Sequence, residues 1–237
     1  MLLLLPLIAL AASTPDWVAP ARRLSGEAKN VRKEMVEKIR AVAGLEKSLL
    51  AELGGPHRFL AYDVMTALEL RTLLPEILEH LETDDTGFAV HAANSLSRAE
   101  DRMVLIQKYR KALESEKTAA PALMALLDTL GRLGALLTPD LCEKMLRHPS
   151  YEVREAALNY LRTAILRLGQ QDWAIRVSPA LESDQPWQIR VQALFLLSEL
   201  PPRNRRSLAS AFKKACAHLP DQEASRLCQA LGKDASQ

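Results

Sequence analysis

Two stretches of this chain repeat one another, and their repetition is the strongest constraint on its fold. "HPSYEVREAALNYLRTAI" spans His148 to Ile165, and "SDQPWQIRVQALFLLSEL" spans Ser183 to Leu200. Shifting the first by 36 residues superimposes matching residues: Tyr151 on Trp187, Val153 on Ile189, Arg154 on Arg190, Ala157 on Ala193, Leu158 on Leu194 and Leu161 on Leu197. Apolar residues three and four positions apart follow the helical period, so each stretch predicts an amphipathic helix.

The same spacing extends beyond these two stretches. Successive reference positions, each on the second helix of an expected pair, are about 31 to 37 residues apart: Ala61, Ala92, Leu123, Arg154, Arg190 and Leu227. A fixed period of this size indicates a helical repeat array. Leu and Ala dominate while aromatic residues make up 5% of the chain, which favours helices over a β-sandwich. We therefore expect an all-α fold, an α-solenoid of about five to six stacked antiparallel helix pairs.

Helix boundaries follow from Gly, Pro and capping residues between the apolar segments. Thr138 with Pro139 at the first helical position is one such start. The expected helices cover residues 29–52, 57–70, 75–81, 88–96, 101–113, 119–137, 139–147, 151–168, 172–181, 187–200, 207–218 and 221–231.

Two segments carry a resemblance to a known family. "PDLCEKMLRHPSYEVREAALNYL" (Pro139 to Leu161) and "VSPALESDQPWQIRVQALFLLSEL" (Val177 to Leu200) resemble HEAT-like repeats. In that family the second helix of a pair begins with a hydrophobic residue and Arg, followed by small residues and Leu. The specific match covers about 90 residues and the periodicity roughly 200. Leu73 to Leu96 matches more loosely, since His91 or Ala89 stands where Arg is expected.

Arg154 and Arg190 occupy equivalent positions near the starts of two second helices. A guanidinium there can reach carboxylates or backbone carbonyls of the adjoining turn. We interpret the two arginines as an inter-repeat ladder rather than as ligand-binding residues.

The chain begins with "MLLLLPLIALAA", an apolar run without charged side chains. It is shorter than the roughly 20 residues that a membrane-spanning helix needs. Ala9, Ala11, Ala12 and Ser13 provide a plausible cleavage site for a secretory signal, although no Lys or Arg precedes the run. We expect a signal peptide over residues 1–13, a linker over 14–26 and a HEAT-like domain over 27–237. The mature protein is then exported, periplasmic or secreted, and has no transmembrane segment.

The three cysteines are Cys142, Cys216 and Cys228. Cys216 and Cys228 lie on two expected antiparallel helices, and the chain turns between them at Pro220 and Asp221. Cys216 is about four residues before this turn and Cys228 about eight residues after it. An offset of several ångströms makes a disulfide awkward. We therefore expect buried free thiols, leaving open whether any of the three forms a disulfide.

No catalytic signature is present: the sequence has no H-E-x-x-H, C-x-x-C, G-x-S-x-G or phosphate loop. Glu76, His80 and Asp84 recur every four residues, which on one continuous helix can hold a metal. The helix is expected to end near Leu81, so we interpret them as a solvated acidic helix end. We predict no catalytic residue, no cofactor and no metal, and a protein that is not an enzyme.

The net charge is +2, from 31 basic and 29 acidic residues, which does not favour nucleic-acid binding. Basic residues interleaved with acidic ones in the first helix indicate a solvated face. Arg203, Arg205 and Arg206, with Lys213 and Lys214, have no nearby acid before Asp221. This group either contacts an anionic surface or acidic partner or only aids solubility.

Two functions follow from these features. The first is an exported, non-enzymatic scaffold that binds an unidentified protein partner through the second helix of each pair. Its candidate contact residues are Glu155, Asn159, Arg162, Gln188, Gln192, Arg203, Arg205 and Arg206. The alternative is a HEAT-like enzyme or nucleic-acid-binding protein, similar to alkylated-base DNA glycosylases or bilin lyases, if the N-terminal signal is not used. Trp187 after "SDQP" suggests base stacking, but its match to Tyr151 indicates a repeated packing position.

Overall fold

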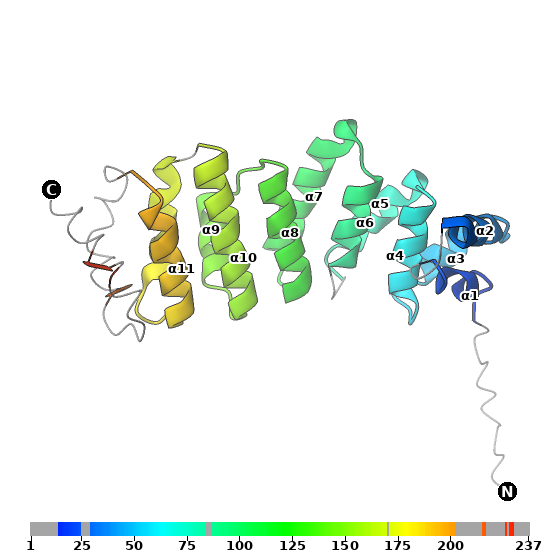
Figure 1. Ribbon diagram of the computed structural model, residues 1–237, viewed down its shortest axis with the longest axis horizontal. Coiled ribbons are helices and arrows are strands. Elements are labelled where there is room, and N and C mark those ends of the chain that lie inside the picture. The colour runs from blue at the N-terminus through cyan, green and yellow to red at the C-terminus, as the bar shows by residue number, and fades with distance from the viewer. Residues whose placement is uncertain are drawn as a thin grey trace, which may run out of the picture. The chain divides into compact units, whose positions relative to one another are not determined.

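The structure is a computed structural model that describes residues 14–24, 29–83, 87–169, 171–201, 215–216, 226 and 228–229. Every regular element in this part of the chain is a helix, so the protein is all-α, as the sequence predicts. The chain divides into two compact units, residues 1–76 and 77–237 (Figure 1). The expected single repeat domain over 27–237 is therefore divided at residue 76.

The first unit contains four short α-helices. These are α1 (Val18–Ala21), α2 (Lys29–Arg40), α3 (Leu45–Ala51) and α4 (Arg58–Ala67), followed by the 3-10 turn η1 (Arg71–Leu73) and the start of α5 (Leu74–Glu79). Helix α1 packs against α2 and α4, and α3 packs against α4.

Two expectations for this unit need correction. Residues 14–24 belong to the folded unit rather than to a linker, because Trp17 is fully buried and its indole nitrogen donates to the Ser48 hydroxyl at 3.0 Å. The single helix expected over 29–52 is interrupted at Gly44, whose φ of +66° lies in the left-handed region that ends one helix before the next begins.

The second unit holds the repeats. Its elements are α6 (Phe88–Leu96), η2 (Ala99–Asp101), α7 (Arg102–Glu114), α8 (Ala120–Arg132), α9 (Pro139–Leu146), α10 (Tyr151–Arg162), η3 (Thr163–Arg167), η4 (Gln171–Leu181) and α11 (Trp187–Ser198). The expected helices over 207–218 and 221–231 lie almost wholly outside the described residues, as does the expected signal peptide over 1–13.

The repeated residues form the core that their spacing predicts. Val153 and Ile189 are fully buried, and the matching Ala and Leu positions of α10 and α11 are buried as well. Trp187 is an exception to the expected packing position, because 41% of its surface is exposed at the start of α11.

The helices of this unit form two rows. Helices α6, α8, α10 and α11 pack in sequence against one another, and we call them the second-helix row. Helix α7 packs against α8, α9 against α10, and η4 against both α9 and α11; we call these three the first-helix row. Figure 1 shows α8, α10 and α11 side by side, with α9 behind α10.

Two elements differ from the regular helices expected. The helix expected over 151–168 ends at Arg162 and continues as the π-helical turn η3. The segment 171–181 is a 3-10 helix, and it contains Pro179, which lacks the N–H that an α-helical hydrogen bond to the fourth preceding carbonyl requires.

Side-chain caps begin the paired helices where the sequence places them. The Thr138 hydroxyl accepts a hydrogen bond from the Leu141 amide at 3.3 Å, with Pro139 at the first position of α9. The Ser150 hydroxyl accepts from the Val153 amide at 3.3 Å and starts α10. Each cap satisfies an amide that has no partner within its own helix.

The loop between α8 and α9 is fixed by hydrogen bonds from other helices. The buried Tyr160 hydroxyl donates to the Ala135 carbonyl at 2.8 Å and accepts from the Leu137 amide at 2.7 Å. Arg110 of α7 donates to the Leu136 carbonyl at 2.6 Å, and Arg102 donates to the Leu133 carbonyl. Burial raises the pKa of Tyr160, so its hydroxyl stays protonated and can act as donor and acceptor at once.

A second polar network crosses between the rows near α6. The Asn94 amide donates to the Thr129 hydroxyl at 2.9 Å, and the Tyr109 hydroxyl donates to the Asn94 carbonyl oxygen at 3.0 Å. Thr129 is 2% exposed, and Tyr109 is fully buried. Because buried polar groups cost free energy unless they are paired, these bonds fix α6, α7 and α8 in one register.

The cysteines correct one expectation and agree with another. Cys216 and Cys228 form a disulfide, with their Cα atoms 5.8 Å apart, where we expected free thiols. The expected offset assumed two straight helices turning at Pro220, a segment outside the described residues. Cys142 is free and buried on α9, as expected, and burial raises the pKa of its thiol to about 11.

Tyr160→Phe tests the importance of the hydroxyl. Without it, the Ala135 carbonyl and the Leu137 amide lose a buried partner, at about 1–3 kcal/mol for each group. We expect the free energy of unfolding in urea to fall by about 2–4 kcal/mol. The matched control is Tyr151→Phe, because Tyr151 lies on the same helix but is only half buried. This substitution should change the free energy of unfolding by less than about 1 kcal/mol. An equal effect of both substitutions would contradict this account.

His148 gives the stability a pH dependence. Its Nδ1 accepts a hydrogen bond from the Ser150 amide at 3.1 Å, which requires an unprotonated nitrogen. Burial, and then the positive charges of Arg154 and Lys144, hold the pKa of His148 below its ordinary value. The unfolded chain therefore binds a proton at a higher pH than the folded chain does.

We expect this contribution to stability to be complete above about pH 6.5 and to be lost as the pH falls from there toward the folded-state pKa. Urea unfolding at a series of pH values between 8 and 5 measures it. An Asn side chain can accept the same amide without titrating. His148→Asn should therefore flatten the decline, and a decline as steep as that of the unsubstituted protein would contradict the assignment.

Candidate groove between helices α8 and α10

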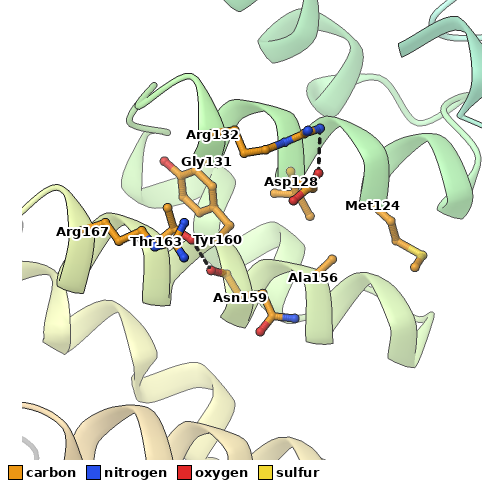
Figure 2. A pocket seen from close by; sticks show the side chains of 10 residues that line it. Met124, Asp128, Gly131, Arg132, Ala156, Asn159, Tyr160, Thr163 and Arg167 are labelled. Carbon is orange, nitrogen blue, oxygen red and sulfur yellow. Dashed lines mark hydrogen bonds and ion pairs between the residues drawn. The ribbon is translucent and has the colours of Figure 1, made fainter. Parts of the chain in front are cut away.

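A groove of about 340 Å³ lies between two neighbours of the second-helix row. Helix α8 lines it with Met124, Leu127, Asp128, Gly131 and Arg132. Helix α10 and its continuation η3 line it with Ala156, Asn159, Tyr160, Thr163 and Arg167. We call this the α8–α10 groove, and Figure 2 shows these side chains.

Gly131 contributes no side chain to the groove. A Cβ atom at this position would lie 3.6 Å from the Tyr160 ring and 3.7 Å from Thr163, so only a hydrogen atom now faces these groups. Any longer side chain would extend into the space between α8 and α10. The Tyr160 ring lies against this position, between the side chains of Arg132 and Arg167 in the view of Figure 2.

A second hollow continues the groove along α10. It is lined by Arg162 and Leu166 together with four residues of the first hollow, Asp128, Asn159, Thr163 and Arg167. Leu166 is 38% exposed, so the continuation has an apolar element as well as charge. The two hollows therefore form one open surface.

The charges around the groove are unequally paired. Arg132 forms an ion pair with Asp128 at 2.9 Å, one turn earlier on α8. Arg162 forms an ion pair with Glu199, beyond the end of α11. Arg167 is exposed and has neither a hydrogen bond nor an ion pair with any described residue. The groove thus has one guanidinium whose donors face solvent.

The described members of the predicted contact set lie on α10 and α11 and make different contacts. Glu155 accepts a hydrogen bond from the Gln192 amide at 2.7 Å, which joins α10 to α11. Arg162 joins the same helices through Glu199. Asn159 and Gln188 are exposed, and Asn159 lines both hollows. Arg203, Arg205 and Arg206 lie outside the described residues. The contact role of all eight residues stays a prediction.

The two ladder arginines make different contacts. Arg154 donates to the His148 carbonyl at 2.7 Å and the Pro149 carbonyl at 3.3 Å, which fixes the turn inside its own helix pair. Arg190, 7% exposed, donates to the Ala215 carbonyl at 3.1 Å and so joins α11 to the segment that follows. The inter-repeat ladder stays a prediction.

Several groove residues were missed by the sequence reasoning. Met124, Asp128 and Arg132 recur every four residues on α8, which would have placed them on one exposed face. Gly131, inside a helix, was a second signal, since a glycine in a helix interior costs stability and can mark a position with a packing or functional role. Arg167 follows Asn159 by eight residues and Thr163 by four, so the helix expected over 151–168 already placed the three on one face.

Among the described residues, no three His, Cys, Asp or Glu side chains gather closely enough to hold a metal ion. Asp84, from the acidic helix end weighed in the sequence, lies outside that part of the chain. The described residues include no helix that is both long enough and apolar enough to cross a bilayer.

Comparison with known proteins gives little further information. No family model matches the sequence, and no curated protein does. A solved structure that the chain resembles is described as the complex of CpcE and CpcF of phycocyanin lyase from Nostoc sp. PCC7120. The identity is 17% over 99% of both chains, with a TM-score of 0.40.

This comparison corrects the expectation that the protein is not an enzyme. The solved structure that matches nearly the whole chain is a complex of a phycocyanin lyase, so that expectation is withdrawn. A likeness at a TM-score of 0.40 carries no argument for a reaction or a substrate.

Proposed function

We propose that this chain is an exported helical-repeat protein that binds a protein partner through its second-helix row, with the α8–α10 groove at the centre of the contact. The groove carries the proposal, because it combines an open apolar floor with polar groups that have no partner among the described residues. Ligand sites in proteins commonly have this composition. Helical-repeat proteins also use the face formed by one row of helices to bind other proteins.

Exposed apolar side chains along the second-helix row support a protein partner. Phe88 on α6, Met124 on α8, Leu166 on η3 and Phe195 on α11 are between 36% and 45% exposed. Large apolar side chains at the solvent boundary gain free energy when a partner buries them. Aromatic residues and Met are also enriched at the centres of protein interfaces.

The disulfide supports the export part of the proposal. Cys216 and Cys228 are bonded, and disulfides persist in the oxidising compartments outside the cytoplasm. The apolar N-terminal run, followed by small residues, agrees with the same destination.

A count of thiols in the protein isolated from its natural source tests export. After denaturation without reductant, we expect alkylation of one cysteine, Cys142, and after reduction of all three. In the native protein Cys142 should react slowly, because burial limits access and raises the pKa of the thiol to about 11. Three reactive thiols without reductant would contradict the disulfide and remove its support for export.

Site-specific photo-cross-linking in living cells tests partner binding. A photoreactive residue placed at Asn159, inside the groove, should give a discrete protein adduct, and one at Gln188 on α11 should give an adduct of the same size. The matched control is Met103 on α7, which is 64% exposed but belongs to the first-helix row.

Adducts at Met103 and none at Asn159 would contradict the proposal, because the partner would then contact the opposite row. The alternative, a HEAT-like enzyme or nucleic-acid-binding protein similar to a bilin lyase or an alkylated-base DNA glycosylase, predicts another outcome. The material cross-linked at Asn159 would then have the mass of a small-molecule ligand or of nucleic acid rather than of a protein.

A further inference from the structure

We propose that the α8–α10 groove binds an acidic peptide segment of the partner that carries one apolar anchor residue. The inference rests on the proposed protein-binding function and specifies the chemistry of the segment. Three properties of the groove support it: an apolar floor, a free guanidinium and a free side-chain amide.

The floor fits an apolar side chain. Leu127 and Tyr160 are buried in its base, while Met124 and Ala156 are partly exposed at its edge. Gly131 adds no side chain beside the Tyr160 ring. An aliphatic or aromatic side chain that enters the groove contacts apolar groups on both helices and leaves water.

The charge of the groove favours a carboxylate. Asp128 is neutralised by Arg132 on the same helix, and Arg162 is neutralised by Glu199. The guanidinium of Arg167 remains; this side chain is exposed and lies beside Thr163 (Figure 2). A guanidinium can donate two parallel hydrogen bonds to one carboxylate, which is the strongest pairing available to it.

Asn159 fits the main chain of such a segment. Its side chain is exposed, lines both hollows and makes no hydrogen bond with a described residue. An amide offers both a donor and an acceptor, so it can pair with the N–H and the C=O of a peptide unit. It lies one helical turn before Thr163 and two turns before Arg167, along the direction in which the two hollows continue.

A nucleic acid fits the groove less well than an acidic peptide does. A polynucleotide brings a negative charge at every step, and it needs a basic track rather than one free arginine. Here Asp128 lies in the wall of both hollows, and Glu199 borders the continuation. A short peptide can instead place one carboxylate at Arg167 and its apolar side chain over Tyr160.

Fluorescence anisotropy with three labelled hexapeptides tests the inference on the full chain. The probes are Glu-Asp-Ser-Phe-Asp-Glu, its basic counterpart Lys-Lys-Ser-Phe-Lys-Lys, and Glu-Asp-Ser-Ser-Asp-Glu, which lacks the apolar anchor. We expect the first to bind at least about tenfold more tightly than either of the others, and to weaken as salt is added. Equal binding of all three would overturn the inference.

Charge reversal at Arg167 gives the second measurement. Arg167→Glu should weaken binding of the first peptide by about tenfold or more, and Arg167→Lys by less, since a lysine keeps the charge but loses the paired donors. Arg40→Glu, an exposed arginine at the end of α2 in the first unit, is the matched control and should leave binding unchanged. Circular dichroism verifies that each variant folds.

The outcomes distinguish failure of the acidic-peptide inference from failure of the proposed protein-binding function. If Asn159 still forms protein adducts in cells while no acidic peptide binds, or while Arg167→Glu has no effect, the acidic-peptide inference is wrong and the protein-binding function stands. If adducts at Asn159 are absent, the function itself is wrong. If Arg167→Glu reduces both peptide binding and the adducts at Asn159, both are supported.

Discussion

The two hydrogen bonds of the Tyr160 hydroxyl are the interaction on which the packing of the second unit depends most. The hydroxyl pairs with a carbonyl and an amide of the loop between α8 and α9, so a residue of α10 completes a turn that belongs to the preceding helices. A buried turn cannot leave these groups unpaired without a cost of about 1–3 kcal/mol for each. The position of α10 against α8 is therefore set by hydrogen bonds, and apolar packing fills the space around them. Arg102 and Arg110 extend the same arrangement to α7.

The same tyrosine connects the stability of the fold to the groove. Its hydroxyl holds the loop, while its ring lies opposite Gly131 and forms the base of the groove. Helices α10 and α11 meet differently, because the Glu155–Gln192 and Arg162–Glu199 pairs bridge them. Polar side chains thus join α10 to α11, whereas between α8 and α10 they surround an open space. This difference is the reason why we propose the α8–α10 groove, and not the contact between α10 and α11, as the binding surface.

The repeat in the sequence predicts most of the second unit, for a physical reason. Residues such as Val153 and Ile189 occupy equivalent buried positions in successive repeats. The spacing of apolar residues in the sequence therefore matches the spacing of the buried positions in the structure. Features that depend on contacts between distant residues were not predictable in this way. The disulfide between Cys216 and Cys228 depends on how two segments meet, and the repeat spacing runs from Ala61 to Ala92 without marking the division at residue 76. The groove itself was not predicted: Asn159 and Arg162 were proposed as contact residues from their helix, whereas the pairing of α8 with α10 that brings Gly131 beside Tyr160 depends on the tertiary structure.

The central claim is that the partner occupies the space between α8 and α10. Hydrogen–deuterium exchange of the purified Asn159 adduct, compared with the same protein before cross-linking, tests it most directly. The account predicts slower exchange in residues 120–132 and 151–167, which form α8, α10 and η3, with little change in α7 and α9 of the opposite row. Protection concentrated in residues 102–114 or 139–146 would place the partner on the first-helix row and would contradict the account.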